Sequence, residues 1–348
     1  MKPAAGAPIV VGGKVLRRDG PVFIVAEGCD NHLGSVDVAR EMIRQAKLAG
    51  ADAIKFQHHL PDEEMLPDVP MSANFDEPLY KFLQKHALTL AQHRELKAYC
   101  GDVGIHYMCT PFSYRAAEEL FSIGVDVFKI GSGEMTDIPS LVRMSQMGLP
   151  LIISTGMSTL DEIRGTCDAL RAAGTRFALM NCVSEYPPAY EDLNLRVITR
   201  LLNEFPEVVI GHSDHSPDLY TSYAAVTLGA RIIEKHVILD KRQPGPDQSV
   251  SIDMRDLAAL VDGIRKVEAA LGDVRAVHPR EQPIREWALR SVVAVTPIRS
   301  GEVIREEMLW TKRPGTGVPA KDLPRFIGRR AVVDIRANTL MRWEFVER

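Results

Sequence analysis

Short apolar runs alternate along the chain with segments whose apolar positions recur every three or four residues. Continuous runs of Val, Ile and Phe are typical of strands in a parallel sheet that is buried on both faces, and the wider spacing predicts amphipathic helices. Strands are predicted at 22–27, 51–57, 104–110, 126–134, 150–156, 176–182, 208–210 and 232–233. The helical segments that follow them are predicted at 36–48, 89–100, 114–123, 138–147, 159–172, about 192–203, 220–228 and 254–271.

Eight strand–helix units in about 270 residues predict a (β/α)8 TIM barrel. A doubly wound open sheet is the alternative, and it usually carries a G-x-G-x-x-G turn after its first strand. The turn here reads AEGCDN and is not such a motif. We therefore predict the α/β barrel.

The organisation changes after Gly272, where prolines and charges replace the regular pattern. We predict a barrel domain over 1–275, a linker over 276–290 and a small, mostly β domain over 291–348, because short alternating runs with Gly and Asn turns fill the last part. A hairpin is expected at 8–20. The long excursion 58–88 is of a length that is often a lid or substrate loop.

Composition limits the classes of function. The chain has 348 residues, 45% hydrophobic and 25% charged, with a net charge of −4, which argues against nucleic acid as a partner. No apolar run of membrane-spanning length and no signal-like segment is visible, so we expect neither a membrane partner nor secretion. The five cysteines form no C-x-x-C pair. We interpret them as reduced thiols of a cytoplasmic protein.

Polar side chains gather where the predicted strands end, which is where barrel enzymes carry their chemistry. Two lysines and several hydroxyls on one rim indicate a site for a polyanion, such as a phosphate with a carboxylate. Any one of them has a plain structural reading, such as a rim lysine paired with Glu27. The residues at the exits are Glu27, Lys55, Gln57, Thr110, Lys129, Ser132, Glu134, Ser154, Thr155, Asn181, Ser184, Ser213, Asp214, His215, Glu234 and His236.

His215 and His236 come at the ends of two of these strands, which belong to one predicted strand–helix–strand unit. Neighbouring parallel strands place their C-terminal ends on one rim, so the two imidazoles could share a divalent metal whose remaining positions take oxygen ligands. Two further histidines, His58 and His59, follow the second strand. We interpret them as part of a solvated loop rather than as extra metal ligands.

The motifs FIVAEGCDNHLGS, ADAIKFQ, CTPFS, FKIGSGEMTDIP, IISTGMST, CVSEYPPAYEDLNL, IGHSDHS, GARIIEKHVILD and PGPD resemble the sialic acid synthase (N-acetylneuraminate synthase) family, which includes legionaminic and pseudaminic acid synthases. The segment RSVVAV…GEVI…KRPGTG resembles that family's C-terminal antifreeze-like (SAF) domain. The resemblance covers almost the whole chain. It implies condensation of phosphoenolpyruvate with an open-chain N-acylated mannosamine-type sugar and release of phosphate. It also implies a divalent metal, typically Mn²⁺ with Mg²⁺ and Co²⁺ as alternatives, and a homodimer.

The resemblance also implies roles for single residues. His215 and His236 match the metal ligands, and Arg313 matches an arginine that reaches the partner subunit's barrel. The catalytic set is Glu27, Lys55, Lys129 and Glu134, with Glu27 or Glu134 as the carboxylate that handles the water added at C2. The substrate-binding set is Gln57, Thr110, Phe112, Ser132, Ser154, Asn181, Ser184, Tyr186, Ser213, Asp247 and Arg313.

Some positions depart from the family's pattern. The turn after Glu27 is EGCDNH where the family has E-x-G-x-N-H, so Cys29 stands in the place of a glycine and Asp30 adds a charge. These changes leave the acceptor open between N-acetylmannosamine and a 2,4-diacetamido-2,4,6-trideoxy hexose. Another metal-dependent keto-sugar-acid synthase and a non-enzymatic carbohydrate- or ice-binding protein remain as rival classes.

Overall fold

The computed structural model describes residues 8–70, 75 and 77–347, and part of the 58–88 excursion lies outside these ranges. The chain divides into two compact units, Met1–Leu271 and Gly272–Arg348. The segment interpreted as a linker, 276–290, falls within the second unit. It contains the short helix α11 (Gln282–Ala288), which has a proline in its first turn.

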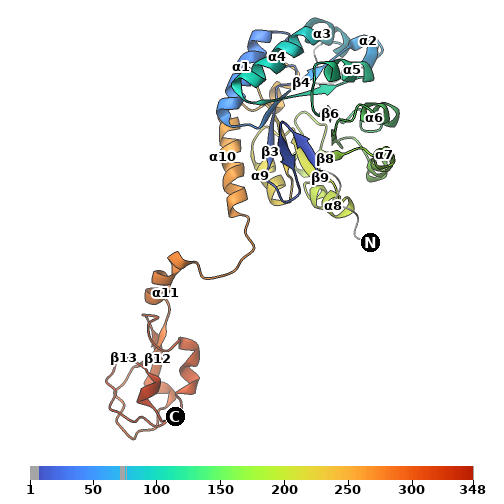
Figure 1. The fold of residues 1–348 in the computed structure, drawn as a ribbon. Coiled ribbons are helices and arrows are strands. Elements are labelled where there is room, and N and C mark those ends of the chain that lie inside the picture. The colour runs from blue at the N-terminus through green and yellow to red at the C-terminus, as the bar shows by residue number, and fades with distance from the viewer. Residues whose placement is uncertain (1–7, 71–74, 76, 348) are drawn as a thin grey trace. The chain divides into compact units, whose positions relative to one another are not determined.

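Eight parallel strands form one sheet in the first unit, in the order β5-β4-β3-β10-β9-β8-β7-β6. The end strands β5 and β6 lie beside each other and nearly close the sheet, which confirms the predicted barrel (Figure 1). The strands are β3 (Phe23–Glu27), β4 (Ala53–His58), β5 (His106–Pro111), β6 (Phe128–Ile130), β7 (Leu151–Ser154), β8 (Phe177–Cys182), β9 (Val209–Asp214) and β10 (Ile232–His236).

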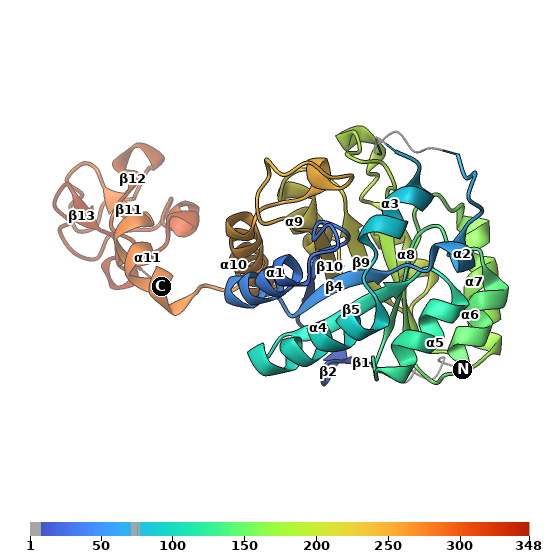
Figure 2. The same ribbon diagram turned by 90° about the horizontal axis from the view of Figure 1, so that it is seen from above.

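Helices surround the strands (Figures 1 and 2). The helices are α1 (Val36–Ala49), α4 (Leu90–Val103), α5 (Tyr114–Ser122), α6 (Ile138–Ser145), α7 (Leu160–Ala172), α8 (Val197–Glu204), α9 (Tyr220–Thr227) and α10 (Met254–Ala270). Two starts are fixed by capping boxes, in which Thr89 and Thr159 each exchange hydrogen bonds with the residue three positions on. Helix α8 begins later than predicted, because a 3-10 turn at Tyr190–Asp192 precedes it.

The barrel interior is apolar at one end and polar at the other. Alternate strand residues point inward, and the inward residues nearest the strand starts form one apolar cluster that includes Phe23, Ala53 and Ile232. The hairpin β1 (Ile9–Val11) and β2 (Lys14–Leu16), predicted at 8–20, adds its apolar side chains to this cluster. The cluster therefore closes the N-terminal end of the barrel, and polar inward positions are confined to the C-terminal end.

The long excursion after β4 contains two short helices, α2 (Pro61–Glu64) and α3 (Leu79–His86). No helix in the described part of the chain is both long enough and apolar enough to cross a membrane.

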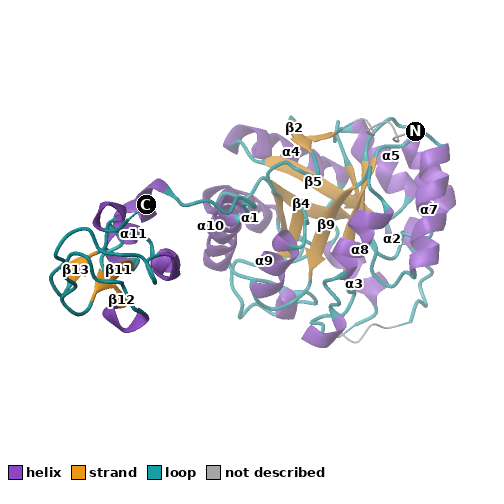
Figure 3. Cartoon of the chain, turned by 90° about the horizontal axis from the view of Figure 1, so that it is seen from below, coloured by secondary structure: helices purple, strands orange, loops and turns teal. Residues whose placement is uncertain are grey.

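The second unit has a small antiparallel sheet of β12 (Leu309–Lys312), β11 (Ser291–Ala294) and β13 (Thr339–Leu340), and most of the rest is loop (Figure 3). Its own core contains Val292, Ala294, Ile335 and Phe326, and Trp343 stacks on Phe326. The small, mostly β domain expected from the sequence is thus present.

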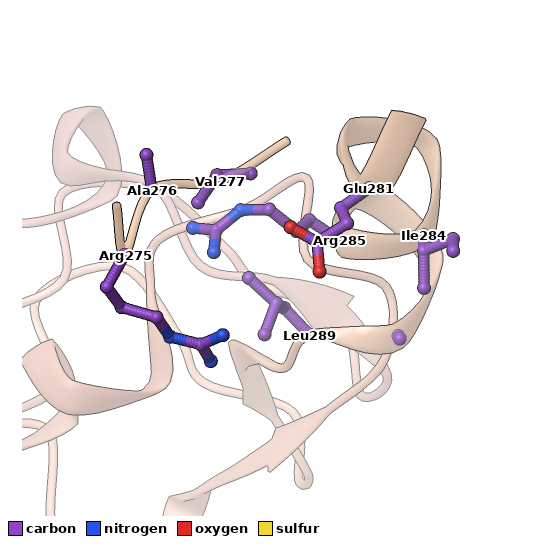
Figure 4. Close-up of a pocket in the computed structure, with 8 residues that line it drawn as sticks. Arg275, Ala276, Val277, Glu281, Ile284, Arg285 and Leu289 are labelled. Atoms are coloured by element: carbon purple, nitrogen blue, oxygen red, sulfur yellow. The ribbon is translucent and has the colours of Figure 1, made fainter. Parts of the chain in front are cut away.

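A hollow in this unit lies between α11 and the segment before it. Figure 4 shows the guanidinium groups of Arg275 and Arg285 on the same side as Leu289, while Ile284 lies apart from them. This hollow contains neither the histidines nor the lysines predicted for the site.

Candidate active site

A cavity of about 380 Å³ opens at the C-terminal ends of the barrel strands. Most of the predicted site residues line it, because they occupy the last inward positions of their strands or the loops directly after them. Those in the lining are Glu27, Lys55, Gln57, Thr110, Phe112, Lys129, Ser132, Ser154, Ser184, Tyr186, Ser213, His215, His236 and Asp247.

Four buried charges lie at the base of the cavity. Lys55 Nζ is 2.7 Å from Glu27 Oε2 and 3.6 Å from Glu234 Oε2, and Lys129 Nζ is 3.5 Å from Glu234 Oε1. Burial raises the pKa of Glu27 despite the neighbouring Lys55. For Glu234 the penalty of burial is outweighed by Lys129 and Lys55, which lower its pKa to about 2. The four charges balance, so the base of the cavity is neutral when both carboxylates are ionised.

Hydroxyl groups hold the lysine ammonium groups in place. Lys55 Nζ donates to Thr110 Oγ1 at 2.9 Å, and Lys129 Nζ donates to Ser154 Oγ at 2.7 Å. A lysine ammonium has three N–H donors, so both can also donate to an anion in the cavity. Such fixed cations are suited to a phosphate or carboxylate.

A glycine makes room beside these lysines. A Cβ added at Gly156 would lie 2.3 Å from Ser184 Oγ and 2.6 Å from Ser132 Oγ. No side chain could be accommodated there without moving both hydroxyls. The absence of a Cβ lets the two serine hydroxyls converge on one point, as a cradle for anionic oxygens requires.

The two predicted metal ligands lie together at one side of the cavity. The rings of His215 and His236 are 5.1 Å apart, and Tyr186 stacks on His215. His215 Nδ1 lies 2.8 Å from the Val183 carbonyl, which leaves Nε2 free for a ligand bond, in the arrangement usual for metal-bound histidines.

The donor set fits a divalent metal. His236 Nδ1 is buried and has no hydrogen-bond partner among the described residues, and Asp247 Oδ2 lies 3.9 Å from it. Cys29, His236 and Asp247 offer ligand atoms that all lie within 4.8 Å of one another. Imidazole nitrogen, thiol sulfur and carboxylate oxygen are ligands of Zn²⁺, Co²⁺, Fe²⁺ and Mn²⁺.

The interpretation of His58 and His59 as a solvated loop is wrong, because both are buried. His58 points away from the cavity and lies 2.9 Å from Glu119. His59 lines the cavity, stacks on Phe112, and lies 3.0 Å from Glu64. His58 packs against His93 of α4 and Glu119 of α5, whereas His59 packs against Phe112 and against Glu64 of the excursion, and the local sequence does not reveal these contacts.

Three predicted site residues do not line the cavity. Glu134 is not among the lining residues, although a Cβ added at Gly131 would meet its Oε2 at 2.5 Å, and burial raises the pKa of this carboxyl to about 7. Asn181 Nδ2 lies 3.3 Å from His212 Nδ1. Arg313 belongs to the second unit, where its guanidinium lies over the Trp287 ring.

The alternation of side chains along a strand explains which strand-end residues face the cavity and which face away from it. In β8 the inward positions are Ala178 and Met180, so Cys182 faces the cavity and its neighbour Asn181 faces outward. The same alternation places Glu234 of β10 inward. Glu234 is among the predicted polar exits but has no role assigned from the sequence, and Cys182 is not among them; both line the cavity, as the alternation along their strands indicates.

Asp214 also faces outward. It lies 3.3 Å from Lys235 Nζ and accepts hydrogen bonds from Thr221 and Ser222, all buried. This pair belongs to the packing of α9 on the barrel rather than to the cavity.

We expect Asp214→Asn to destabilise the fold by about 3–5 kcal/mol, because it leaves Lys235 as an uncompensated buried charge. Burial raises the pKa of Asp214, but Lys235, His212 and the hydroxyls of Ser222 and Thr221 together outweigh it and lower the pKa, so the stabilisation is present above the unfolded pKa near 3.8 and is lost as the pH falls below it. Urea unfolding at pH 7 measures the change. An unchanged midpoint would contradict the structural role.

Comparison with known proteins identifies the family of the chain. Residues 42–276 match the NeuB family and residues 290–347 match the SAF domain. The chain is 35% identical over 337 residues to N,N'-diacetyllegionaminic acid synthase of Legionella pneumophila, covering 93% of this chain and 94% of that one. It is 34% identical over 334 residues to human N-acetylneuraminate-9-phosphate synthase, covering 94% and 93%.

A solved structure of N-acetylneuraminic acid synthetase from Leptospira borgpetersenii, in complex with citrate, superposes with a TM-score of 0.72 at 31% identity. It covers 80% of this chain and 95% of that one. These matches identify an enzyme of the phosphoenolpyruvate-dependent nonulosonate synthase family with an SAF domain. The chain belongs to the NeuB family.

Proposed function

We propose that the protein condenses phosphoenolpyruvate with the open-chain form of an N-acylated mannosamine-type sugar and releases phosphate. The observation that carries this proposal is the cavity itself, in which two buried lysines and four serines lie beside two histidines. An anion subsite next to a metal-competent subsite is what the joining of an enol phosphate to an aldehyde requires.

Lys55, Lys129 and the hydroxyls around Gly156 hold the phosphate and carboxylate of phosphoenolpyruvate. Their ammonium groups are already fixed by Thr110 and Ser154, so little reorganisation is needed as charge moves towards the phosphate. C3 of phosphoenolpyruvate bonds to the aldehyde carbon, water oxygen bonds to C2, and the C2–O bond to phosphate then breaks.

His215 and His236 hold the divalent metal, which supplies Lewis-acid polarisation of the aldehyde oxygen when bound. Glu27 takes the proton of the water that adds at C2. Its buried carboxylate is suited to this task because its raised pKa brings proton transfer close to neutral pH.

The rest of the cavity wall favours an acceptor sugar that carries no phosphate group. Asp30, Asp247 and His59 line this part of the cavity, and Glu64 lies behind His59. Burial raises the pKa of Asp30 to about 6, so it is mostly ionised at neutral pH and would repel a sugar phosphate.

A second acceptor is favoured by a different part of the wall. Phe75, Leu79 and Leu83, from the excursion after β4, present apolar surface to the cavity. A 6-deoxy sugar carries a methyl group where N-acetylmannosamine carries a hydroxyl, and the methyl gains from apolar contact. The 2,4-diacetamido-2,4,6-trideoxy hexose is therefore the second candidate.

Release of inorganic phosphate from phosphoenolpyruvate tests the proposal, with Mn²⁺ present and N-acetylmannosamine, its 6-phosphate or the trideoxy sugar as acceptor. We expect release with one of the unphosphorylated sugars, little with the 6-phosphate, and none after EDTA treatment. Release with neither unphosphorylated sugar from folded, metal-loaded protein would contradict the proposal.

Arg313 acts in the barrel of a partner subunit, in a cytoplasmic homodimer. In support, α11 leaves the apolar side chains Ile284 and Trp287 more than half exposed within its own unit, and Arg313 lies over that tryptophan. Apolar patches of this kind are typical of subunit contacts.

Mixing two inactive variants tests this arrangement. Glu27→Gln disables the barrel and Arg313→Ala removes the arginine, so a mixed dimer has one barrel with an intact Glu27 served by an intact Arg313 from the other chain. We expect mixing and reassociation to restore up to about a quarter of wild-type turnover, from random pairing of chains and one repaired site in each mixed dimer. No recovery, with mixed dimers present, would mean that Arg313 acts in its own chain or not at all.

A further inference from the structure

Cys29 occupies an unusual backbone position directly after β3. Its φ is 38°, in the left-handed region that non-glycine residues rarely adopt, and its side chain is fully buried. The turn is held by a hydrogen bond from Gly28 N to Lys55 O at 2.8 Å and by one from Asn31 N to Gly28 O at 3.1 Å. These contacts hold the thiol beside the metal-competent side of the cavity.

Two other potential ligands face that thiol. The ligand atoms of Cys29, His236 and Asp247 all lie within 4.8 Å of one another. Ligand atoms that share one metal lie about 2.1–2.3 Å from it, and therefore at most about 4.4 Å apart. Small side-chain rotations suffice to bring the three ligand atoms within this distance of one another.

His236 is an independent indication of a ligand at this point. Its side chain is about 5% exposed, and its Nδ1 has no hydrogen-bond partner within the described ranges. Leaving such a buried nitrogen unsatisfied costs free energy, which a bond to a metal would recover.

The two loops that carry these groups are tied together without any metal. Asn31 Nδ2 donates to the Val237 carbonyl and to Ser251 Oγ, both at 2.9 Å, and Ser251 Oγ donates to the Asp247 carbonyl at 2.7 Å. The loop after β3 is therefore positioned against the loop after β10, and Cys29 is held near His236 and Asp247.

We propose that Cys29 is a further, thiolate ligand of the divalent metal assigned above to His215 and His236, in one set with His236 and Asp247. The inference rests on the proposed function only in that a metal occupies this side of the cavity. As the bond forms, the thiol proton leaves to solvent. A sulfur ligand shifts the preference of the site towards Zn²⁺, Co²⁺ and Fe²⁺ and away from Mg²⁺.

Titration of the metal-free full-length protein with Co²⁺ under reducing conditions tests the proposal, because a cobalt–thiolate bond gives a near-ultraviolet charge-transfer band. We expect the band in the wild type. We expect Cys29→Gly to lose it and to bind Co²⁺ at least about 10-fold more weakly by calorimetry. Glycine suits a φ of 38°, so this variant should keep the wild-type fold by circular dichroism.

Cys182→Ser is the matched control, because Cys182 is a thiol that lines the cavity and its Sγ lies 3.9 Å from His215 Nδ1. We expect this variant to retain the band. Bound Co²⁺ without a band in the wild type, a band that survives in Cys29→Gly, or a band lost in Cys182→Ser would each overturn the proposal. The spectrum does not depend on turnover, so failure here is distinguishable from failure of the phosphate-release assay.

Discussion

Glu27→Gln is expected to lower turnover by about 10²–10⁴-fold, the range in which a positioned acid–base group contributes, while leaving the protein folded. Gln keeps the size of the side chain and one oxygen that accepts hydrogen bonds, but it cannot accept the proton of the attacking water. Steady-state phosphate release at saturating phosphoenolpyruvate and acceptor measures the effect.

The fold should survive because burial raises the pKa of Glu27 above its unfolded value. A raised carboxyl pKa means that the ionised form is disfavoured in the folded state, so this carboxylate costs stability at pH values above its folded pKa. The neutral Gln removes that cost, and Lys55 keeps Glu234 at 3.6 Å and Thr110 at 2.9 Å. Thermal unfolding at pH 8 should therefore change little.

Glu119→Gln is the matched control, because Glu119 is bound to His58 outside the cavity. It should retain turnover. Glu134→Gln separates the two candidate carboxylates, and we expect a smaller loss because Glu134 does not line the cavity. Near-normal turnover in Glu27→Gln would remove Glu27 from the mechanism.

His236→Ala is expected to abolish measurable turnover at ordinary metal concentrations. Removing a residue that hydrogen-bonds to a metal ligand weakens metal binding about 10–100-fold, so removing the ligand itself should weaken metal binding at least as much. Calorimetric titration of the metal-free protein with Mn²⁺ measures the affinity directly. After EDTA treatment, added Mn²⁺ should restore the wild type but not the variant.

His106→Ala is a control of the same residue type, because His106 lies at the start of β5 and its Nε2 is 2.9 Å from Asp126. Its metal affinity should equal that of the wild type. Unchanged Mn²⁺ affinity in His236→Ala would place the metal elsewhere.

The barrel could be predicted from the sequence because each strand is buried on both faces and each helix on one. Those two burial patterns follow directly from the spacing of apolar residues along the chain. Gly50 and Thr89 mark helix ends because they are cap residues, Gly50 at a C-terminus and Thr89 at an N-terminus. Polar strand exits could be found for the same reason, since a barrel gathers them on one rim.

Strand alternation limits which exit residues can face the cavity, but only the tertiary structure decides which of the two alternating sets points inward. Inward and outward positions differ by one residue, so Asp214 and Asn181 lie outside while Glu234 and Cys182 lie within. The burial of His59 depends on the excursion after β4 folding over it. The sequence by itself determined the strand–helix order, the two lysines and the two histidines. The meeting of Cys29, His236 and Asp247 comes from loops more than 200 residues apart, and only folding brings such distant segments within bonding distance.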